Sequence, residues 1–402
     1  MMGPAPRPVK AKADPAKAGP GEGRRPRRAR SPRVPAPEEA DPTGPGGPGT
    51  PVDVVSLGES MVTFLPSRPG RLADVPAFTR TIGGAESNVA CALAAAGHTV
   101  RWISRVGADG FGDHLVEAIG AYGVDTSAVR RDADGRPTGI YFRTATDRST
   151  TAHEVAYYRA GSAASAMSPR TMDLADLWSG RVLHLSGITA ALSDDCLALM
   201  RELSERRAGR PLLSFDVNHR PALWRDDSGP RVLLDLSRGA DLVFVGDDEA
   251  AQLWDLHSPE AIREALPEPA VLVVKAGANG ATAFVRDPGT GTGADTATDT
   301  VTSVPALAVD VVAPVGAGDA FAAGFLSATL RDLPTEARLR HGHLTAAAVL
   351  TDAGDVSAPP ARAHADRLAA LDDAAWAGLR LGPGWTSGAA EPGQRQEAVP
   401  AS

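Results

Sequence analysis

The sequence predicts an α/β fold with three layers, in which helices cover both faces of a mostly parallel central sheet and a small β-lid is attached. Short runs rich in Val, Ile and Leu recur through residues 52–304, and amphipathic helical patterns follow most of them. A run that is apolar throughout is typical of a strand buried on both faces, as in parallel sheets. The repeated order of strand and then helix favours a doubly wound sheet.

The sequence pattern places the expected strands and helices along the chain. Six runs are the expected strands of the central sheet: 52–57, 99–106, 181–185, 211–215, 241–245 and 270–275. The helical patterns between them include 86–96, 112–122, 194–206 and 247–256. Two segments, at about 75–81 and 138–158, depart from this alternation of strand and helix, and we expect them to form a small antiparallel lid. From residue 316 to about residue 381 the pattern is nearly all helical.

Composition divides the chain of 402 residues into a folded domain and two tails. Residues 1–51 carry ten lysines and arginines against five acidic residues, and 13 of the 33 prolines, without a hydrophobic period. We expect them to be a disordered, Pro/Arg-rich tail, the domain to span 52–381, and 382–402 to be a second disordered tail. Beyond residue 51 the chain has 31 basic residues against 44 acidic ones. A domain this acidic is a poor nucleic-acid binder, so no nucleic-acid partner is expected.

No membrane partner is expected either. No stretch approaches the roughly 20 consecutive apolar residues that a bilayer span requires, and no apolar signal segment follows the N-terminal basic residues. The two cysteines, Cys91 and Cys196, lie in apolar helical patterns and are too few for a disulfide framework. These observations indicate a cytoplasmic protein.

A glycine loop at 313–325 is the most informative segment of the sequence. Gly316 and Gly318 open a long apolar helix, and the unpaired N–H groups of a helix N-terminus form an anion pocket. The spacing is neither a Walker A motif nor a dinucleotide fingerprint. Asp319 lies in the first helical turn, where a carboxylate can accept a proton from a hydroxyl. On spacing alone, an Asp at this position is more often a helix cap, and both interpretations stay open.

This segment resembles the second signature of the PfkB (ribokinase-like) family of carbohydrate kinases, and 83–90, Gly-Gly-Ala-Glu-Ser-Asn-Val-Ala, resembles the first. The two signatures stand in the family's order, and the resemblance spans about residues 52–360. It implies a ribokinase-like α/β sandwich with a β-lid and the transfer of a phosphoryl group from ATP, with Mg2+, to a sugar. By the resemblance, Asp319 is the catalytic base, and Gly316, Ala317 and Gly318 form the anion hole.

Within the family the chain is most similar to 2-dehydro-3-deoxygluconate (KDG) kinases, through segments 83–88, 141–143, 157–163, 184–187 and 216–220. The resemblance implies a substrate site made of Gly84, Asn88, Tyr141, Arg143, Tyr158, Arg159, Arg220 and Asp319. Because KDG is an acid, the arginines are candidates for binding its carboxylate, which matches a guanidinium in two hydrogen bonds. The alternatives are a kinase of a neutral sugar such as fructose or ribose, and a sugar-binding regulatory protein without turnover. The sequence does not separate the gluconate from its galactonate epimer.

The resemblance also implies a nucleotide site. Its residues are Asp216, Asn218, Lys275, Gly277, Gly280, Gly318 and Thr345, and Glu249 is expected to organise Mg2+ through water. The chain departs from the family at Ala313, where many members have an Asp that helps bind a monovalent cation, so the need for K+ stays open. The expected partners are a sugar or sugar acid, ATP, and a second copy of the chain joined through the β-lid.

Overall fold

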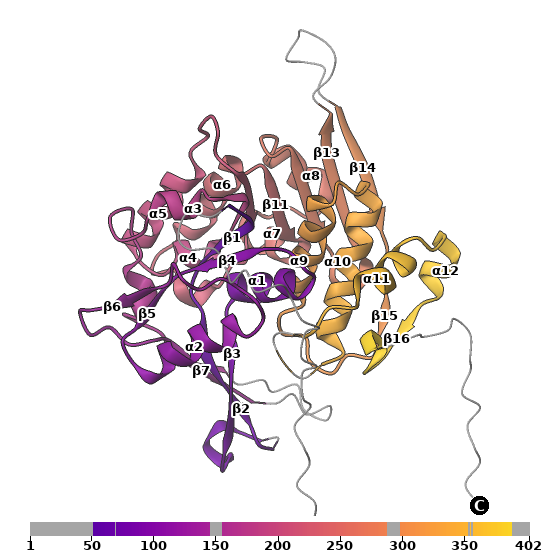
Figure 1. Ribbon diagram of the computed structural model, residues 1–402. Helices are drawn as coiled ribbons and strands as arrows, with labels where there is room; N and C mark the ends of the chain where they lie inside the picture. The colour runs from indigo at the N-terminus through magenta and orange to yellow at the C-terminus, as the bar shows by residue number, and fades with distance from the viewer. Residues whose placement is uncertain are drawn as a thin grey trace, which may run out of the picture. The chain divides into compact units, whose positions relative to one another are not determined.

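The central sheet of the computed structural model has eight strands in the order β14-β13-β12-β11-β10-β9-β1-β4 (Figure 1). The structure describes residues 51–387 except 69, 145–154, 288–297, 353, 355 and 356. The strands are β1 (Val52–Leu57), β4 (Val100–Ile103), β9 (Gly180–Ser186), β10 (Leu212–Asp216), β11 (Leu242–Gly246), β12 (Val271–Lys275), β13 (Ala281–Asp287) and β14 (Thr298–Val304). The six neighbouring strands β12, β11, β10, β9, β1 and β4 are parallel, β13 runs antiparallel to β12, and β14 runs antiparallel to β13. The predicted mostly parallel sheet is therefore confirmed, although β13 and β14 were not among the expected strands.

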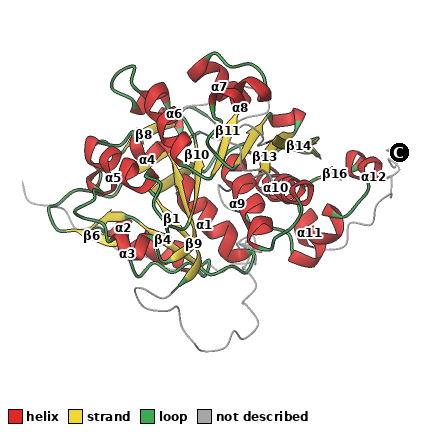
Figure 2. Cartoon of the chain, turned by 90° about the horizontal axis from the view of Figure 1, so that it is seen from above, coloured by secondary structure: helices red, strands yellow, loops and turns green. Residues whose placement is uncertain are grey.

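Helices cover both faces of this sheet, as the view from above shows (Figure 2). One layer contains α1 (Ala85–Ala95), α9 (Ala317–Leu330) and α10 (Thr335–Leu350); the other contains α5 (Asp194–Ser204), α6 (Gly229–Gly239), α7 (Asp247–Trp254) and α8 (Pro259–Ala265). Successive strand residues point to opposite faces. Phe244 accordingly belongs to the core under α9, and its neighbours Val243 and Val245 belong to the core under the other layer. The remaining helices are α2 (Gly110–Gly120), α3 (Leu174–Leu177), α4 (Gly187–Ala190), α11 (Arg362–Ala369) and α12 (Asp373–Gly378).

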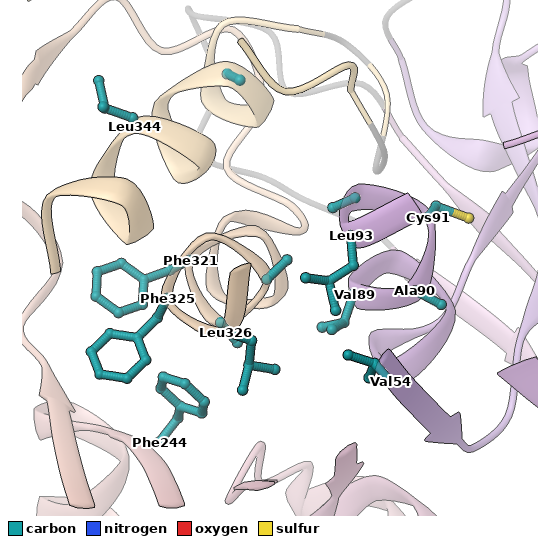
Figure 3. Close-up of a cluster of buried hydrophobic side chains, with 14 of the residues drawn as sticks. Val54, Val89, Ala90, Cys91, Leu93, Phe244, Phe321, Phe325, Leu326 and Leu344 are labelled. Carbon is teal, nitrogen blue, oxygen red and sulfur yellow. The ribbon is translucent and has the colours of Figure 1, made fainter. Parts of the chain in front are cut away.

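Helix α9 is the centre of its layer. Figure 3 shows Phe321 and Phe325 of α9 on the side of Phe244 in β11, and α1 with Val89 and Leu93 on the opposite side of α9. The ring of Phe325 meets that of Phe244 edge to face at 5.5 Å. Such aromatic pairs stabilise a core beyond their buried area by about 0.5–1.5 kcal/mol. This packing fixes the N-terminus of α9, where the glycine loop lies.

The β-lid contains β2 (Met61–Pro66), β3 (Phe78–Gly83), β7 (Ile140–Arg143) and β8 (Val155–Tyr158), in the order β3-β2-β7-β8. The expectation of a wholly antiparallel lid from 75–81 and 138–158 was wrong on two points. It omitted β2, and β2 runs parallel to β7. Between β3 and β7 the chain passes through a long connection that includes α1, β4 and α2. Such a connection, unlike a tight turn, allows β7 to run in the same direction as β2.

Two boundaries differ from the predicted ones. The run 99–106 divides into β4 and β5 (Arg105–Gly107), and β5 pairs with β6 (Arg130–Asp132). The domain continues past 381, because β16 (Arg380–Leu381) pairs with β15 (Ala308–Val309) and Trp385 is buried in the core. The expected tail therefore began too early at 382, while residues 1–50 and 388–402 lie outside the described residues. Across the described ranges, none of the helices is both long and apolar enough to cross a bilayer.

Candidate active site

Two cavities meet at the N-terminus of α9. The lid cavity has a volume of about 510 Å3, and the helix cavity has a volume of about 740 Å3. The lid cavity lies between the β-lid, α1, the segment after β10 and the glycine loop; its lining includes Met61, Gly84, Asn88, Tyr141, Tyr157, Arg159, Arg220, Arg225, Gly316 and Asp319. The helix cavity lies between the β12–β13 turn, α9 and α10; its lining includes Lys275, Gly277, Gly280, Ala317, Gly318, His343, Ala346 and Leu350. Both lie where ligands bind doubly wound sheets, beyond the carboxyl ends of the parallel strands.

The glycine loop forms the wall between the two cavities. Gly316 and Asp319 line the lid cavity, whereas Ala317 and Gly318 line the helix cavity. Gly316 has φ of 83°, a left-handed conformation that glycine adopts without a steric cost, and α9 begins at the next residue. The first turn of a helix presents unpaired N–H groups and a partial positive charge. An anion at this wall would therefore be stabilised between the two cavities.

Asp319 is placed to accept a proton from a molecule in the lid cavity. Its Oδ2 accepts a hydrogen bond of 2.8 Å from Asn88 Nδ2. Burial raises the pKa of Asp319 to about 7 and the charge of Asp216 adds to the rise, although Asn88, Lys275 and Arg220 oppose it. A carboxyl group that titrates near neutral pH suits a general base.

Lys275 provides a cation on the other side of the wall. Its Nζ donates a hydrogen bond of 2.8 Å to Asp216 Oδ2, and it lies 3.7 Å from the point where a Cβ on Gly318 would stand. Burial lowers the pKa of Lys275, but the charges of Asp216 and Glu249 outweigh this and leave it raised. Lys275 is therefore charged at neutral pH and faces the glycine loop.

Glu249 joins the loops after β10 and β11. It accepts hydrogen bonds from the backbone N–H groups of His219 and of Gly246, the latter at 3.2 Å. Burial and then the charge of Asp216 raise the pKa of Glu249. In the described part of the chain, no three His, Cys, Asp or Glu side chains lie close enough together to hold a metal ion. The carboxylates of Asp216 and Glu249 fit an Mg2+ ion that takes most of its oxygen ligands from phosphate and water.

The structure brings together most of the predicted substrate residues. Gly84, Asn88, Tyr141, Arg159 and Arg220 all line the lid cavity. Arg220 is exposed, and within the described ranges no carboxylate lies at ion-pair distance from it; its Nη1 donates to the carbonyl oxygen of His219 at 2.9 Å. Arg220 therefore adds a positive charge that no ion pair neutralises within the described ranges, and this charge also lowers the pKa of Asp319.

Tyr158 was predicted as a substrate residue, but it points away from the lid cavity. It is 64% exposed, and its ring meets that of Phe142 edge to face at 6.0 Å on the other side of the lid. Tyr157 lines the cavity instead, with its ring 5.3 Å from that of Tyr141. Adjacent residues of a strand point to opposite faces, so an error of one position reverses the side chain.

Two further predicted residues lie elsewhere. Arg143 is buried at the end of β7, and the described lining of the lid cavity does not include it. Thr345, expected beside the adenine, lines a separate cavity of about 310 Å3 between α1, α9, α10 and α11. Ala346 lines the helix cavity in its place, because neighbouring helix residues differ in direction by about 100°.

The expected nucleotide residues lie on or next to the helix cavity. Lys275, Gly277, Gly280 and Gly318 line it. Asp216 and Asn218 are buried at the end of β10 and contribute to neither described lining, although Asp216 holds Lys275. The sequence reasoning missed Arg225, His343 and Ala346, which carry no motif, and it missed Tyr157, whose pairing with Tyr141 across β7 and β8 is given only by the structure.

Comparisons with known proteins agree with this geometry. Residues 52–362 match the family described as pfkB family carbohydrate kinase. The chain is 34% identical over 319 residues to a 2-dehydro-3-deoxygluconokinase of Bacillus subtilis, covering 77% of this chain and 93% of that protein. It is 30% identical over 299 residues to a probable fructokinase of Arabidopsis thaliana, covering 71% and 73%.

A solved structure shows the same fold. The PfkB protein from Polaromonas sp. JS666 is 34% identical, superposes with a TM-score of 0.67, and is matched over 78% of this chain and 99% of that one. The family match covers more than half of the chain and includes both signatures and the glycine loop between the two cavities. The chain therefore belongs to the pfkB family of carbohydrate kinases.

Proposed function

We propose that the protein transfers the γ-phosphoryl group of ATP to the 6-hydroxyl of 2-dehydro-3-deoxygluconate. The observation that carries this proposal is the position of the glycine loop between two cavities. Asp319 faces the lid cavity, while Gly318 and Lys275 face the helix cavity. A phosphoryl acceptor on one side and a donor on the other would meet at the N-terminus of α9.

Asp319, the glycine loop and Lys275 each have a separate role in the phosphoryl transfer. The sugar hydroxyl in the lid cavity gives its proton to Asp319, and its oxygen forms a bond to the γ-phosphorus as the bond to ADP breaks. Negative charge on the transferring group lies against the N–H groups of Ala317 and Gly318 and near Lys275. Mg2+, when bound with ATP, neutralises phosphate charge, and Asp216 and Glu249 are the residues that would hold it through water. ADP leaves from the helix cavity.

The cations of the lid cavity support the proposal that the substrate is an acid. Arg220 and Arg225 line this cavity and form no ion pair within the described ranges, whereas Arg159 is paired with Glu59. A guanidinium suits a carboxylate, and a neutral sugar has less need for two of them. The relatives named 2-dehydro-3-deoxygluconokinase are also more similar to the chain, at 34% identity, than the fructokinases, which are 28–31% identical to it.

A screen of ADP release against KDG, its galactonate epimer, fructose and ribose tests the proposal. We expect kcat/KM for one or both sugar acids to exceed that for fructose by at least about a hundredfold, which is about 2.7 kcal/mol. Phosphorus NMR of the product should place the phosphate on carbon 6. A preference for fructose would favour a neutral-sugar kinase, and no turnover of any sugar would favour a regulatory protein.

A second copy of the chain is the proposed partner at the outer face of the lid. On the face of the lid opposite the cavity, Phe64, Phe78, Phe142 and Tyr158 form an aromatic cluster in which the rings of Phe64 and Phe142 stack at 4.7 Å. Phe111 of α2 covers part of this cluster, since its ring meets that of Phe64 edge to face at 5.9 Å, and leaves the ring of Tyr158 exposed. The strands β3 and β8 are the edges of this sheet, and a sheet edge offers unpaired backbone groups to another strand. A symmetric pair of lids would cover the exposed ring of Tyr158.

A further inference from the structure

Glu59 lies in the turn between β1 and β2, beneath the lid. Its Oε1 accepts a hydrogen bond of 2.5 Å from Ser162 Oγ, and its Oε2 forms an ion pair with Arg159 Nη2. The side chains of Glu59 and Arg159 are only 1% and 9% exposed. A carboxylate removed from water in this way needs its partners, because breaking a buried pair leaves an uncompensated charge.

Three of the segments that connect the main domain to the lid come together at Glu59. Glu59 itself is in the first crossing, Gly139 directly precedes β7, and Arg159 and Ser162 follow β8. A Cβ on Gly139 would lie 2.9 Å from Glu59 Oε1 and 3.4 Å from the Cβ of Arg159, so glycine leaves the room that this carboxylate occupies. Glu59 therefore joins the segment after β8 to the end of β1, and Gly139 leaves room for its carboxylate at the start of β7.

Arg159 faces the lid cavity while Glu59 holds it from below. Its guanidinium carbon lies 5.9 Å from the centre of the Tyr157 ring, and both residues line the cavity. Its Nε is buried and has no hydrogen-bond partner among the described residues. The ion pair with Glu59 and the neighbouring Tyr157 ring thus restrict the orientation of the guanidinium at the edge of the cavity.

We propose that Glu59 is a positioning residue for substrate binding, which orients the guanidinium of Arg159 toward an oxygen of the sugar in the lid cavity. The inference rests on the proposed function, because it assigns a role within the same site. Since Glu59 compensates the charge of Arg159, Arg159 acts through the direction of its hydrogen bonds. The positive charge that attracts a sugar acid then comes from Arg220 and Arg225, which line the same cavity and form no ion pair within the described ranges.

Glu59→Gln tests this role, because the amide keeps the shape and a hydrogen-bond acceptor but loses the charge that holds Arg159. We expect KM for KDG to rise by about tenfold or more, kcat to stay within about threefold, and KM for ATP to be unchanged. The matched control is Asp125→Asn, which weakens another buried pair, Arg101 with Asp125 at 2.8 Å, outside both cavities. This control should lower Tm without changing KM.

A double-variant cycle with Arg159→Met decides whether Glu59 acts through Arg159. Adding Glu59→Gln to Arg159→Met should raise KM by less than about twofold further, because the group it orients is already gone. The inference is overturned if Glu59→Gln lowers Tm with KM within twofold of wild type, or if the two effects on KM multiply. Failure of wild-type protein to phosphorylate KDG would overturn the proposed substrate instead. In that case the double-variant cycle is measured with whichever sugar the wild-type protein phosphorylates. If it phosphorylates no sugar, the cycle is measured as sugar affinities by calorimetry.

Discussion

Asn88 Nδ2 donates a hydrogen bond of 2.8 Å to Asp319 Oδ2, joining residues that are 231 positions apart in the sequence. Asn88 belongs to the first signature, on α1, and Asp319 to the second, on α9. The two helices pack side by side in one core, so the contact follows from the packing of Val89 and Leu93 against α9 (Figure 3). Asn88 also opposes the rise in the pKa of Asp319 that burial causes. The first signature therefore helps to set the protonation of the carboxylate in the second.

Replacing Asp319 by Asn should nearly abolish phosphoryl transfer. The amide keeps the shape of the side chain but cannot take the proton of the hydroxyl, and loss of a general base typically lowers kcat by about 10²–10⁴-fold. The affinity for ATP, measured by calorimetry, should stay close to that of wild type, because Asp319 faces the other cavity. A variant that keeps more than about a tenth of wild-type kcat contradicts the assignment.

The pH dependence of kcat/KM should show an acid limb near pH 7. The pKa of Asp319 is raised to about 7, so the carboxyl is protonated and inactive as a base below this pH, and activity is gained as the pH rises through it. Removing the Asn88 amide in Asn88→Ala takes away a hydrogen bond that lowers this pKa, so the limb should move to higher pH. The measurement is kcat/KM from about pH 5.5 to 9.

Glu86 provides the control for this profile. It is fully buried, accepts hydrogen bonds from Ser186 and Thr189, and burial raises its pKa to about 7 as well. If Asp319 is the group observed, Glu86→Gln should keep an acid limb. Loss of the limb in Glu86→Gln, or an unchanged limb in Asn88→Ala, would assign the titration to another group.

The sequence predicted the parts of the site that lie in contiguous motifs, and it failed where a face had to be chosen. Gly316 and Asp319 follow from a local glycine pattern at a helix start. Tyr157 and Tyr158 are adjacent and chemically identical, so no polar contrast showed which one faces the cavity. The same holds for Thr345, because α10 is buried over most of its surface and has no amphipathic stripe from which to read a direction.

Arg220→Ala should raise KM for KDG by one to two orders of magnitude, because the variant removes one of the two cations of the lid cavity that form no ion pair within the described ranges, and the one whose charge acts on Asp319. A hydrogen bond to a charged group contributes about 1.5–3 kcal/mol, which corresponds to this range. Turnover of fructose or ribose, where detectable, should change much less. Equal losses on KDG and on a neutral sugar would show that Arg220 does not bind the carboxylate.

The two lid tyrosines should separate substrate binding from self-association. Tyr157→Ala removes a ring from the lid cavity, so KM for the sugar should rise by at least about fivefold with the mass in solution unchanged. Tyr158→Ala removes a ring from the outer cluster, so the mass measured by light scattering should fall toward that of one chain, with KM within about threefold. A reversal of these two results would contradict the placement of both rings, and an unchanged mass in Tyr158→Ala would exclude the lid as the site of pairing.

Potassium should have little effect on turnover, because Ala313 stands where the family resemblance places an Asp that helps bind a monovalent cation. Alanine has no side-chain oxygen, and hard cations depend on oxygen ligands. Asp310 does not replace the missing group: its backbone N–H donates to Leu381, and its Oδ2 lies 3.0 Å from where a Cβ on Gly382 would stand, which places it beside the C-terminal segment. We therefore expect kcat in Tris buffer with Mg2+ to change less than about twofold on addition of K+, or less than about 0.5 kcal/mol in barrier. Ala313→Asp restores a carboxylate and should introduce a saturable activation by K+. Tenfold activation of the wild-type protein would contradict the argument, and its loss in Asp310→Ala would identify Asp310 as the ligand after all.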